Sequence, residues 1–326
     1  MKKGRILEAA AAAAGLFVLI IDSKTALSGA REGLDVCIRV LIPTLFPFFF
    51  LSSWLSGKIS GISLPGSMLI SKLFGIPAGT ESLLLCGLLG GYPVGAVTVD
   101  EAVNQSRVSP AEGKRLLCIC NQCGPAFIFG MSAVLFDRPM VGWALMLLQI
   151  VSALITAHLL PGTDGVDYRR KAIPSPRNPM DQALRSTANV CGWVILFKTL
   201  VVFIQRWILW AVPVSIQCAI AGFLEMSNGC LLLPEVPSVE LRFVMCAAFL
   251  NFGGLCVTMQ THSLVKHTDK RLYIPGKLVQ CAVASTLCLA LWGKAYFWIP
   301  LIFTVALCLV LRKYEKRCGN FRSVVV

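Results

Sequence analysis

A run of amide and small side chains, Cys120-Asn121-Gln122-Cys123-Gly124-Pro125, interrupts an apolar stretch of the chain. An amide side chain in hydrocarbon costs several kcal/mol unless it is hydrogen-bonded, so this cluster either joins helices or lines a cavity. Pro125 removes a helical hydrogen bond and frees a carbonyl group, which creates the unwound polar spot that a substrate site needs. Asn251, followed by Gly253 and Gly254, forms a second break of similar composition. We therefore expect a substrate-binding set of Asn121, Gln122, Gly124, Pro125, Asn251 and Gly254.

A second segment rich in small residues, Gly90-Gly91-Tyr92-Pro93, lies upstream of the first break. Its glycines allow helices to approach closely, and Pro93 interrupts a helix beside a phenol group that can donate a hydrogen bond. Helix packing alone would also explain the glycines. Our working expectation is that Tyr92 faces the same cavity as the amides and contacts the substrate.

Two cations lie within or beside apolar runs, namely Arg39, which precedes Pro43, and Lys198 in the stretch VILFKTLVVF. An intramembrane charge faces the protein interior by default and marks the path of an ion or substrate. Arg39 can also snorkel to the membrane surface, which is harder for Lys198. Because both are cations, Arg39 and Lys198 favour an anionic substrate that bears carboxylates.

Other reactive patterns carry less weight. Cys118, Cys120 and Cys123 are spaced like metal ligands, but a helix would spread their side chains around its axis, and no fourth ligand is evident. His262 and His267 have no carboxylate or serine placed to build a nucleophilic site. The basic residues are spread among loops, without the aromatic interleaving of a nucleic-acid surface. We expect no metal, no cofactor, no enzymatic activity and no nucleic-acid partner.

The composition identifies the elements that must position these residues. Of the 326 residues 56% are hydrophobic and 14% are charged, and the mean hydropathy is +0.72. Soluble domains carry about 25% charged residues. Apolar runs near the ~20 residues that cross a bilayer as a helix recur along the chain. The first run, within 1–28, fits a secretory signal or a retained helix, and the many later spans favour the retained helix. We therefore predict an all-α polytopic membrane protein.

Charge predicts the topology. Basic residues gather in the linker 161–182, in the loop from Lys266 to Lys277 and in the tail 312–326, whereas the stretch from Glu225 to Glu240 is acidic. Because basic loops stay inside, both termini should be cytoplasmic and the acidic stretch should lie outside. This arrangement requires segments that enter and leave on one side.

The segments 36–55 and 186–212 are the candidates for such re-entrant hairpins. The first contains Pro43 and Pro47, which would interrupt a helix at the tip of a hairpin, whereas the second has no central proline. With both segments treated as hairpins, about eight full spans remain in the chain.

The chain also resembles itself. Several short matches occur in the same order in 29–160 and 183–311, and the charge pattern puts the equivalent loops on opposite sides of the membrane. We therefore predict two inverted repeats, with substrate bound near the midplane where discontinuous helices from both halves meet. The matched positions are Arg31 with Arg185, Cys37 with Cys191, Gly87 with Gly222, Asn121 with Asn251, and Gly124 with Gly254.

The motifs LLGGYPVGA, SPAEGKRLL and CNQCGPAFIFG, in this order, resemble the sporulation integral membrane proteins of the YlbJ type. Members of that family carry a nucleoside-recognition, or gate, domain, and the resemblance covers most of the chain. It implies a protein of the outer forespore membrane that moves dipicolinate during endospore formation. The family motif has two adjacent asparagines and a serine before Gly-Pro, where this chain has Asn121, Gln122 and Cys123. The amide character is retained.

The combined expectation is a multi-pass inner-membrane transporter of a small organic anion, with dipicolinate as the leading substrate. A nucleoside or nucleobase transporter and a non-transporting scaffold of the sporulation machinery are the alternatives. The lipid bilayer is an expected partner, and a homo-oligomer or assembly with other sporulation membrane proteins stays open. An intramembrane enzyme would need a catalytic pair that the sequence does not offer.

Overall fold

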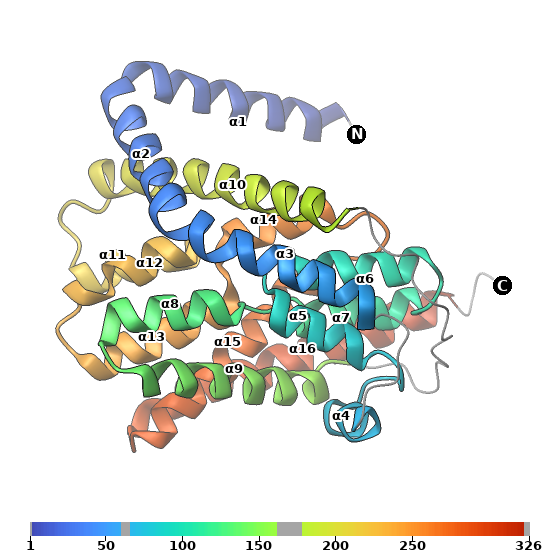
Figure 1. Cartoon of the computed structure of the whole chain (residues 1–326). Coiled ribbons are helices and arrows are strands. Elements are labelled where there is room, and N and C mark those ends of the chain that lie inside the picture. Colours follow the sequence, from blue (N-terminus) through green and yellow to red (C-terminus); the bar gives the residue numbers. More distant parts are fainter. Residues whose placement is uncertain (1, 60–65, 162–177, 323–326) are drawn as a thin grey trace.

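The computed structural model describes residues 2–59, 66–161 and 178–322, and within these ranges every regular element is a helix. Most of the linker 161–182 and the end of the tail 312–326 lie outside the described residues. The N-terminal helix α1 (Lys2–Ile21) is followed by α2 from Ser23, so the predicted boundary at residue 28 falls inside a helix. The helices lie roughly side by side, and α1 begins and α16 ends on the same side of the bundle, at the right in Figure 1.

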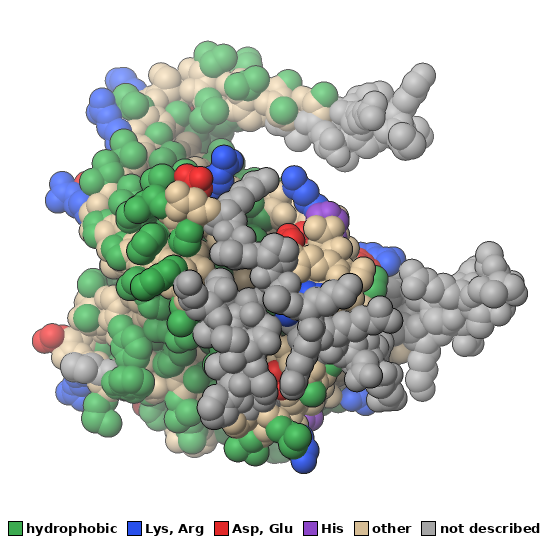
Figure 2. Space-filling model, turned by 45° about the vertical axis from the view of Figure 1, so that its right-hand side comes forward, with side chains coloured by type: hydrophobic (Ala, Val, Ile, Leu, Met, Phe, Trp, Pro, Cys, Tyr) green, Lys and Arg blue, Asp and Glu red, His purple; other side chains and the backbone are tan. Residues whose placement is uncertain are grey.

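Seven helical segments of the described chain are long and apolar enough to cross a membrane. Their outer faces suit lipid, because apolar side chains at helical spacing are exposed; on α9 (Pro139–Leu159), Met140 is 80% and Trp143 67% exposed. Figure 2 shows hydrophobic side chains gathered over the flank of the bundle. The seven segments are Ser23–Leu55, Pro110–Phe136, Met140–Leu159, Pro179–Trp207, Val239–Leu264, Tyr273–Leu291 and Ala295–Lys313.

Neither segment predicted to be a hairpin reverses direction. Segment 36–55 lies in one continuous helical run made of α2 (Ser23–Val36), a π-helical turn (η1, Cys37–Leu41) and α3 (Ile42–Ile59). The N–H of Ile42 bonds to the carbonyl of Cys37, so the helix shifts register just before its prolines and absorbs them without a break. Segment 186–212 begins within α10 (Pro179–Trp207), a helix of 29 residues that has proline only in its first turn.

Two helical hairpins occur elsewhere in the described ranges. The first joins α5 (Glu81–Gly90) to α6 (Val94–Asn104), and glycines in both arms pack against the same backbone carbonyl, that of Cys120. The second joins α11 (Val214–Leu224) to α12 (Met226–Leu232), and its arms meet at Gly222 and Gly229. Small residues are needed at these places because the arms approach too closely for a Cβ atom.

Two of the seven crossing segments are broken in the middle. Helix α7 (Pro110–Cys120) ends at Asn121, and α8 (Pro125–Phe136) resumes after three further residues. Helix α13 (Val239–Phe252) ends at Gly253, and α14 begins at once and covers Gly254–Leu264. Both glycines have positive φ, 83° and 80°, which residues with a Cβ rarely adopt. The two breaks therefore fall where the Asn-Gly motifs predicted them.

The two hairpins occupy opposite halves of the bundle. In Figure 1, α5, α6 and α7 lie in the right half with α14, whereas α11, α12 and α13 lie in the left half with α8. The broken segment α7–α8 thus runs from right to left, and α13–α14 runs from left to right. Helices α9, α10, α15 (Tyr273–Leu291) and α16 (Trp298–Arg322) connect the two sides.

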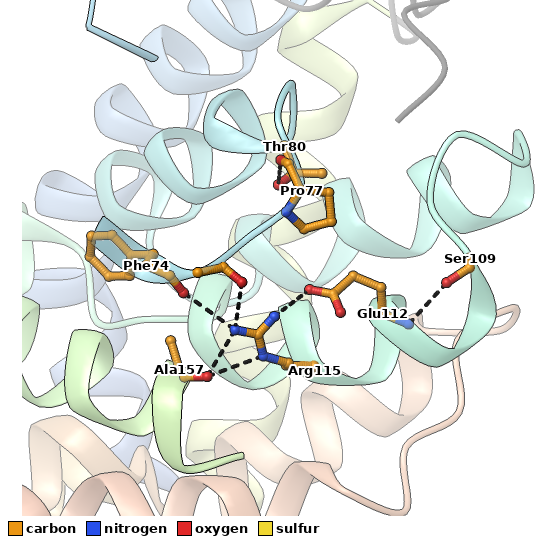
Figure 3. A network of polar contacts seen from close by, with 8 residues as sticks. Phe74, Pro77, Thr80, Ser109, Glu112, Arg115 and Ala157 are labelled. Carbon is orange, nitrogen blue, oxygen red and sulfur yellow. Dashed lines mark hydrogen bonds and ion pairs between the residues drawn. The ribbon is translucent and has the colours of Figure 1, made fainter. Parts of the chain in front are cut away.

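A buried polar cluster fixes the start of α7. Arg115 pairs with Glu112 at 2.7 Å and donates hydrogen bonds to the carbonyl groups of Phe74, Gly75 and Ala157 (Figure 3). These carbonyls end α4 (Ser67–Phe74) and lie near the end of α9, where the helical partners are missing. The cluster therefore joins three helix ends on one side of the bundle.

Candidate functional site

A cavity lies where the two hairpin tips meet the two broken helices. The space not occupied by atoms amounts to about 520 Å³, counting the part that is open to the surroundings. Helices α3 and α10 close it with apolar side chains, among them Phe49 and Val194. The residues nearest the tips and breaks are Gly90, Gly91, Tyr92, Cys123, Gly124, Ala126, Glu225, Met226, Ser227, Val257 and Gln260.

Each hairpin tip touches the break of the helix that follows it. A Cβ atom on Gly91 would lie 2.8 Å from the Cα of Gly124 at the first break. At the second break, a Cβ on Gly254 would lie 3.1 to 3.3 Å from atoms of Leu224, Glu225 and Met226. The predicted residues Gly124 and Gly254 thus serve close backbone approach, and of these two only Gly124 lines the cavity.

Tyr92 lines the cavity and also bridges the two halves of the bundle. Its hydroxyl group donates a hydrogen bond of 3.2 Å to the carbonyl of Leu250, in the last turn of α13, and its ring packs on Gly253. The ammonium group of Lys277 lies 5.3 Å from the centroid of the same ring, within cation–π distance. Tyr92 therefore places the first hairpin against the second break.

Asn121 is fully buried and bonded at both ends of its amide. Its Oδ1 accepts from the N–H of Ala96 in the first turn of α6, and its Nδ2 donates to Thr261 at 3.0 Å and to the Tyr273 hydroxyl at 2.8 Å. Asn121 thus caps one arm of the first hairpin and ties it to α14 and α15. It does not itself line the cavity.

Gln280 on α15 connects the two breaks. Its amide exchanges two hydrogen bonds with the amide of Gln122, at 2.7 and 3.1 Å, and its Nε2 also donates to Oδ1 of Asn251 at 3.0 Å. Lys277, one turn earlier, is fully buried and donates to the Oε1 atoms of Gln280 and Gln122. Gln122 and Asn251 are therefore both bonded to Gln280, and neither of them lines the cavity.

The two predicted cations lie away from the cavity. Arg39 is 76% exposed and pairs with Asp35 on the same helical run. Lys198 pairs with Glu32 of α2 at 3.2 Å, and this contact joins α10 to α2. Neither side chain is among those that line the cavity, so the geometry does not place them at a solute.

Three residues in or near the cavity were not predicted as site residues from the sequence. Glu225, assigned from its charge to an outer acidic loop, is 2% exposed at the second hairpin tip. Lys277, assigned to a basic loop, is fully buried inside α15. Gln260 is buried on α14, and its Oε1 has no hydrogen-bond partner within the described structure. A charged or amide side chain within an apolar run was the available signal in each case.

No group of three or more His, Cys, Asp or Glu side chains in the described parts of the chain is arranged to hold a metal ion. Cys118, Cys120 and Cys123 are all buried among helices, as thiols that serve as small apolar side chains. In the loops, Asp269 bonds to Arg271, and this contact lowers the pKa of its carboxyl group.

Asp100, in the last turns of α6, fastens the first hairpin to the loop after α14. Its carboxylate accepts from three consecutive backbone N–H groups, those of Lys266, His267 and Thr268, at 2.7 to 2.9 Å. Burial acts to raise the pKa of Asp100, but these donors outweigh it and hold the pKa below its ordinary value of 3.8. A carboxyl group of lowered pKa stabilises the fold above its ordinary pKa, and this contribution is lost as the pH falls through the lowered value.

The Asp100→Asn substitution should therefore lower the stability at pH 7 by roughly 1–3 kcal/mol, because the amide presents one acceptor and two donors to three N–H groups. Thermal unfolding in detergent, followed at pH 7 and near pH 3, measures the effect, which should shrink in acid. The matched control is Glu101→Gln, an exposed neighbour, which should change little at either pH. An equal loss of stability at both pH values would contradict a role for the ionised carboxylate.

Comparison with known proteins adds one relative. No family model matches the chain, and no solved structure gives a significant match. The sporulation integral membrane protein YlbJ of Bacillus subtilis (strain 168) is 24% identical over 334 aligned positions, which cover 85% of this chain and 80% of the relative. The resemblance predicted from the motifs is thus confirmed: this chain is similar, over most of its length, to the sporulation integral membrane protein of the YlbJ type.

Proposed function

We propose that this chain is a transporter that moves a small organic anion across a membrane. The observation that carries the proposal is the cavity at which two hairpin tips and two broken helices meet. Discontinuous helices cost backbone hydrogen bonds inside a bilayer, so they persist where they line a cavity or a substrate path. Simple helix packing would not need four such interruptions at one place.

The proposal includes two inverted repeats, roughly 29–160 and 183–311. Each half contains a long helix, a hairpin, a broken helix and a further long helix in the same order. The opposite directions of α7–α8 and α13–α14 in Figure 1 support the inversion, and the basic ends of the chain support a cytoplasmic location of both termini. In this arrangement the hairpins are re-entrant from opposite membrane surfaces.

Two features favour an anionic solute. Helix α8 begins at the cavity with Gly124 as its N-cap, and no side chain caps this helix end, whose positive dipole end suits an anion. The amino group of Lys277, which can carry a proton, lies 5.3 Å from the centroid of the Tyr92 ring. The family resemblance supplies the specific candidate, dipicolinate, carried in the outer forespore membrane during sporulation. A nucleoside would instead need several hydrogen-bonding side chains in a cavity that is mostly apolar.

Uptake of labelled dipicolinate into vesicles that contain the purified protein tests the proposal. Gln260→Leu should raise the KM about tenfold, because tenfold corresponds to the ~1.4 kcal/mol of one hydrogen bond. Gln182→Leu makes the same change at a glutamine of α10 that does not line the cavity, and it should behave as wild type. Saturable uptake of a nucleoside in place of dipicolinate would reassign the substrate.

A membrane scaffold without transport is the second candidate, and one observation favours it. The amides of Asn121, Gln122 and Asn251 all form hydrogen bonds to other side chains of the protein, as structural contacts would. Asn121 bonds to Thr261, and both Gln122 and Asn251 bond to Gln280. Wild-type protein that is folded and monodisperse, yet moves neither dipicolinate nor a nucleoside, would support a scaffold over a transporter.

A further inference from the structure

Glu225 is the one charged side chain among those that line the cavity in the described structure. It lies at the tip of the second hairpin, between α11 and α12, and is 2% exposed. Its carboxylate accepts from the backbone N–H groups of Ser227 at 3.1 Å and Asn228 at 2.8 Å, and from the Ser227 hydroxyl. All three donors are neutral, so within the described residues the charge has hydrogen bonds but no cation in contact.

The titratable groups on the elements around Glu225 do not neutralise it. Lys198 on α10 acts on it through space, but its ammonium group pairs with Glu32. Among the described residues, the other titratable neighbours are thiols, those of Cys37 on η1, Cys230 on α12 and Cys256 on α14. An isolated carboxylate buried in a membrane protein is expensive to keep charged, and this cost makes Glu225 a candidate for a functional group.

Two features of the surroundings act in opposite directions on the charge of Glu225. Burial disfavours the ionised carboxylate, whereas three hydrogen-bond donors favour it. An anionic solute in the same cavity adds repulsion between like charges in a poorly screened space. Occupation by the anion and protonation of Glu225 are therefore linked, and by reciprocity a bound proton must favour the anion as much as the anion favours the proton.

We propose that Glu225 couples transport to the proton gradient: one carboxylate oxygen takes up a proton when the anion enters the cavity and releases it when the anion leaves on the other side. This inference rests on the proposed function and names its driving ion. The place of Glu225 on a hairpin tip suits this role, because the tip touches the second helix break and must shift if the cavity is to open on one side only.

Vesicles with the wild-type protein and the membrane potential clamped at zero test the proposal. A pH difference of one unit, acid on the side from which solute enters, should produce roughly tenfold accumulation of labelled dipicolinate for one proton per solute. Glu225→Gln, which mimics the protonated state, should exchange labelled solute across the membrane but accumulate none. Glu225→Asp keeps a titratable group and should retain gradient-driven accumulation.

Glu240→Gln is the matched control, because Glu240 is a carboxylate that pairs with Lys294 away from the cavity. It should accumulate solute as wild type does. Accumulation by Glu225→Gln under the pH gradient, or accumulation by wild type under a sodium gradient alone, would overturn the coupling role while leaving transport intact. Absence of any uptake by folded wild-type protein would instead overturn the transport function, and the coupling role with it.

Discussion

Replacing Arg115 by alanine is expected to destabilise the protein by about 3–5 kcal/mol, because removing one partner of a buried ion pair is strongly destabilising. Glu112 is 1% exposed in its side chain and would lose the guanidinium group that pairs with it, and the carbonyls of Phe74, Gly75 and Ala157 would lose their donor. A loss of this size is a large share of the 5–15 kcal/mol that typically separates folded from unfolded protein. The expected readout is a large fall in the yield of monodisperse protein and in its unfolding temperature in detergent.

Arg39→Ala is the matched control for Arg115→Ala. Both arginines pair with a carboxylate on their own helical run, but the Arg39 side chain is 76% exposed and that of Arg115 is 6% exposed. An exposed pair contributes little, so Arg39→Ala should leave the unfolding temperature close to that of wild type. Equal effects of the two substitutions would show that burial does not decide how much each ion pair contributes.

Gly87→Ala is expected to have the second large effect. A Cβ atom at this position would lie 1.7 Å from the carbonyl oxygen of Cys120, and a backbone carbonyl cannot rotate aside as a side chain can. Overpacking of this kind costs about 1–3 kcal/mol or more, against a gain of at most ~1 kcal/mol in helix propensity. The first hairpin should dock poorly, and both the unfolding temperature and dipicolinate uptake should fall.

Substitutions at two other glycines serve as comparisons for Gly87→Ala. Gly130 on α8 has open space where a Cβ would lie, so Gly130→Ala should be neutral or slightly stabilising. Gly222, the position matched to Gly87 by the internal repeat, would place its Cβ 2.3 Å from the ring of Phe249, a side chain, whereas the Cβ at Gly87 would meet a backbone carbonyl. Its substitution by alanine should therefore be milder than that of Gly87. An unfolding temperature of Gly87→Ala at or above the wild-type value would contradict the close hairpin packing.

The broad architecture was predictable because the apolar interior of a bilayer restricts which residues can cross it and requires them to form helices. Hydropathy and a low charge content identify a helical membrane protein without reference to packing, and the breaks at Gly124-Pro125 and Gly253-Gly254 follow from the backbone chemistry of those residues. The wrong assignment of hairpins has an equally local cause. Pro43 and Pro47 were expected to turn the chain, but the π-helical turn before them absorbs the change of register.

The real hairpins could not be located from composition, because their arms are only 7 to 11 residues long and their tips differ. One tip is Gly91-Tyr92-Pro93, whereas the other is Glu225, which caps its own helix. Counting charges placed Glu225 and Lys277 in loops, since the positive-inside rule says nothing about single charges that fold inward. Their neighbouring apolar residues were the available signal, but the three-dimensional structure is needed to separate a loop charge from a buried charge.

The amide of Gln280 has a mechanical consequence for the two halves. It holds Gln122 at one interruption and Asn251 at the other, so both interruptions are attached to the same point on α15. A movement that separates them has to break this amide pair first, and a shared movement can leave it whole. The two helix breaks are therefore mechanically coupled. Neither can move far unless the other moves with it or the hydrogen bonds of Gln280 are broken.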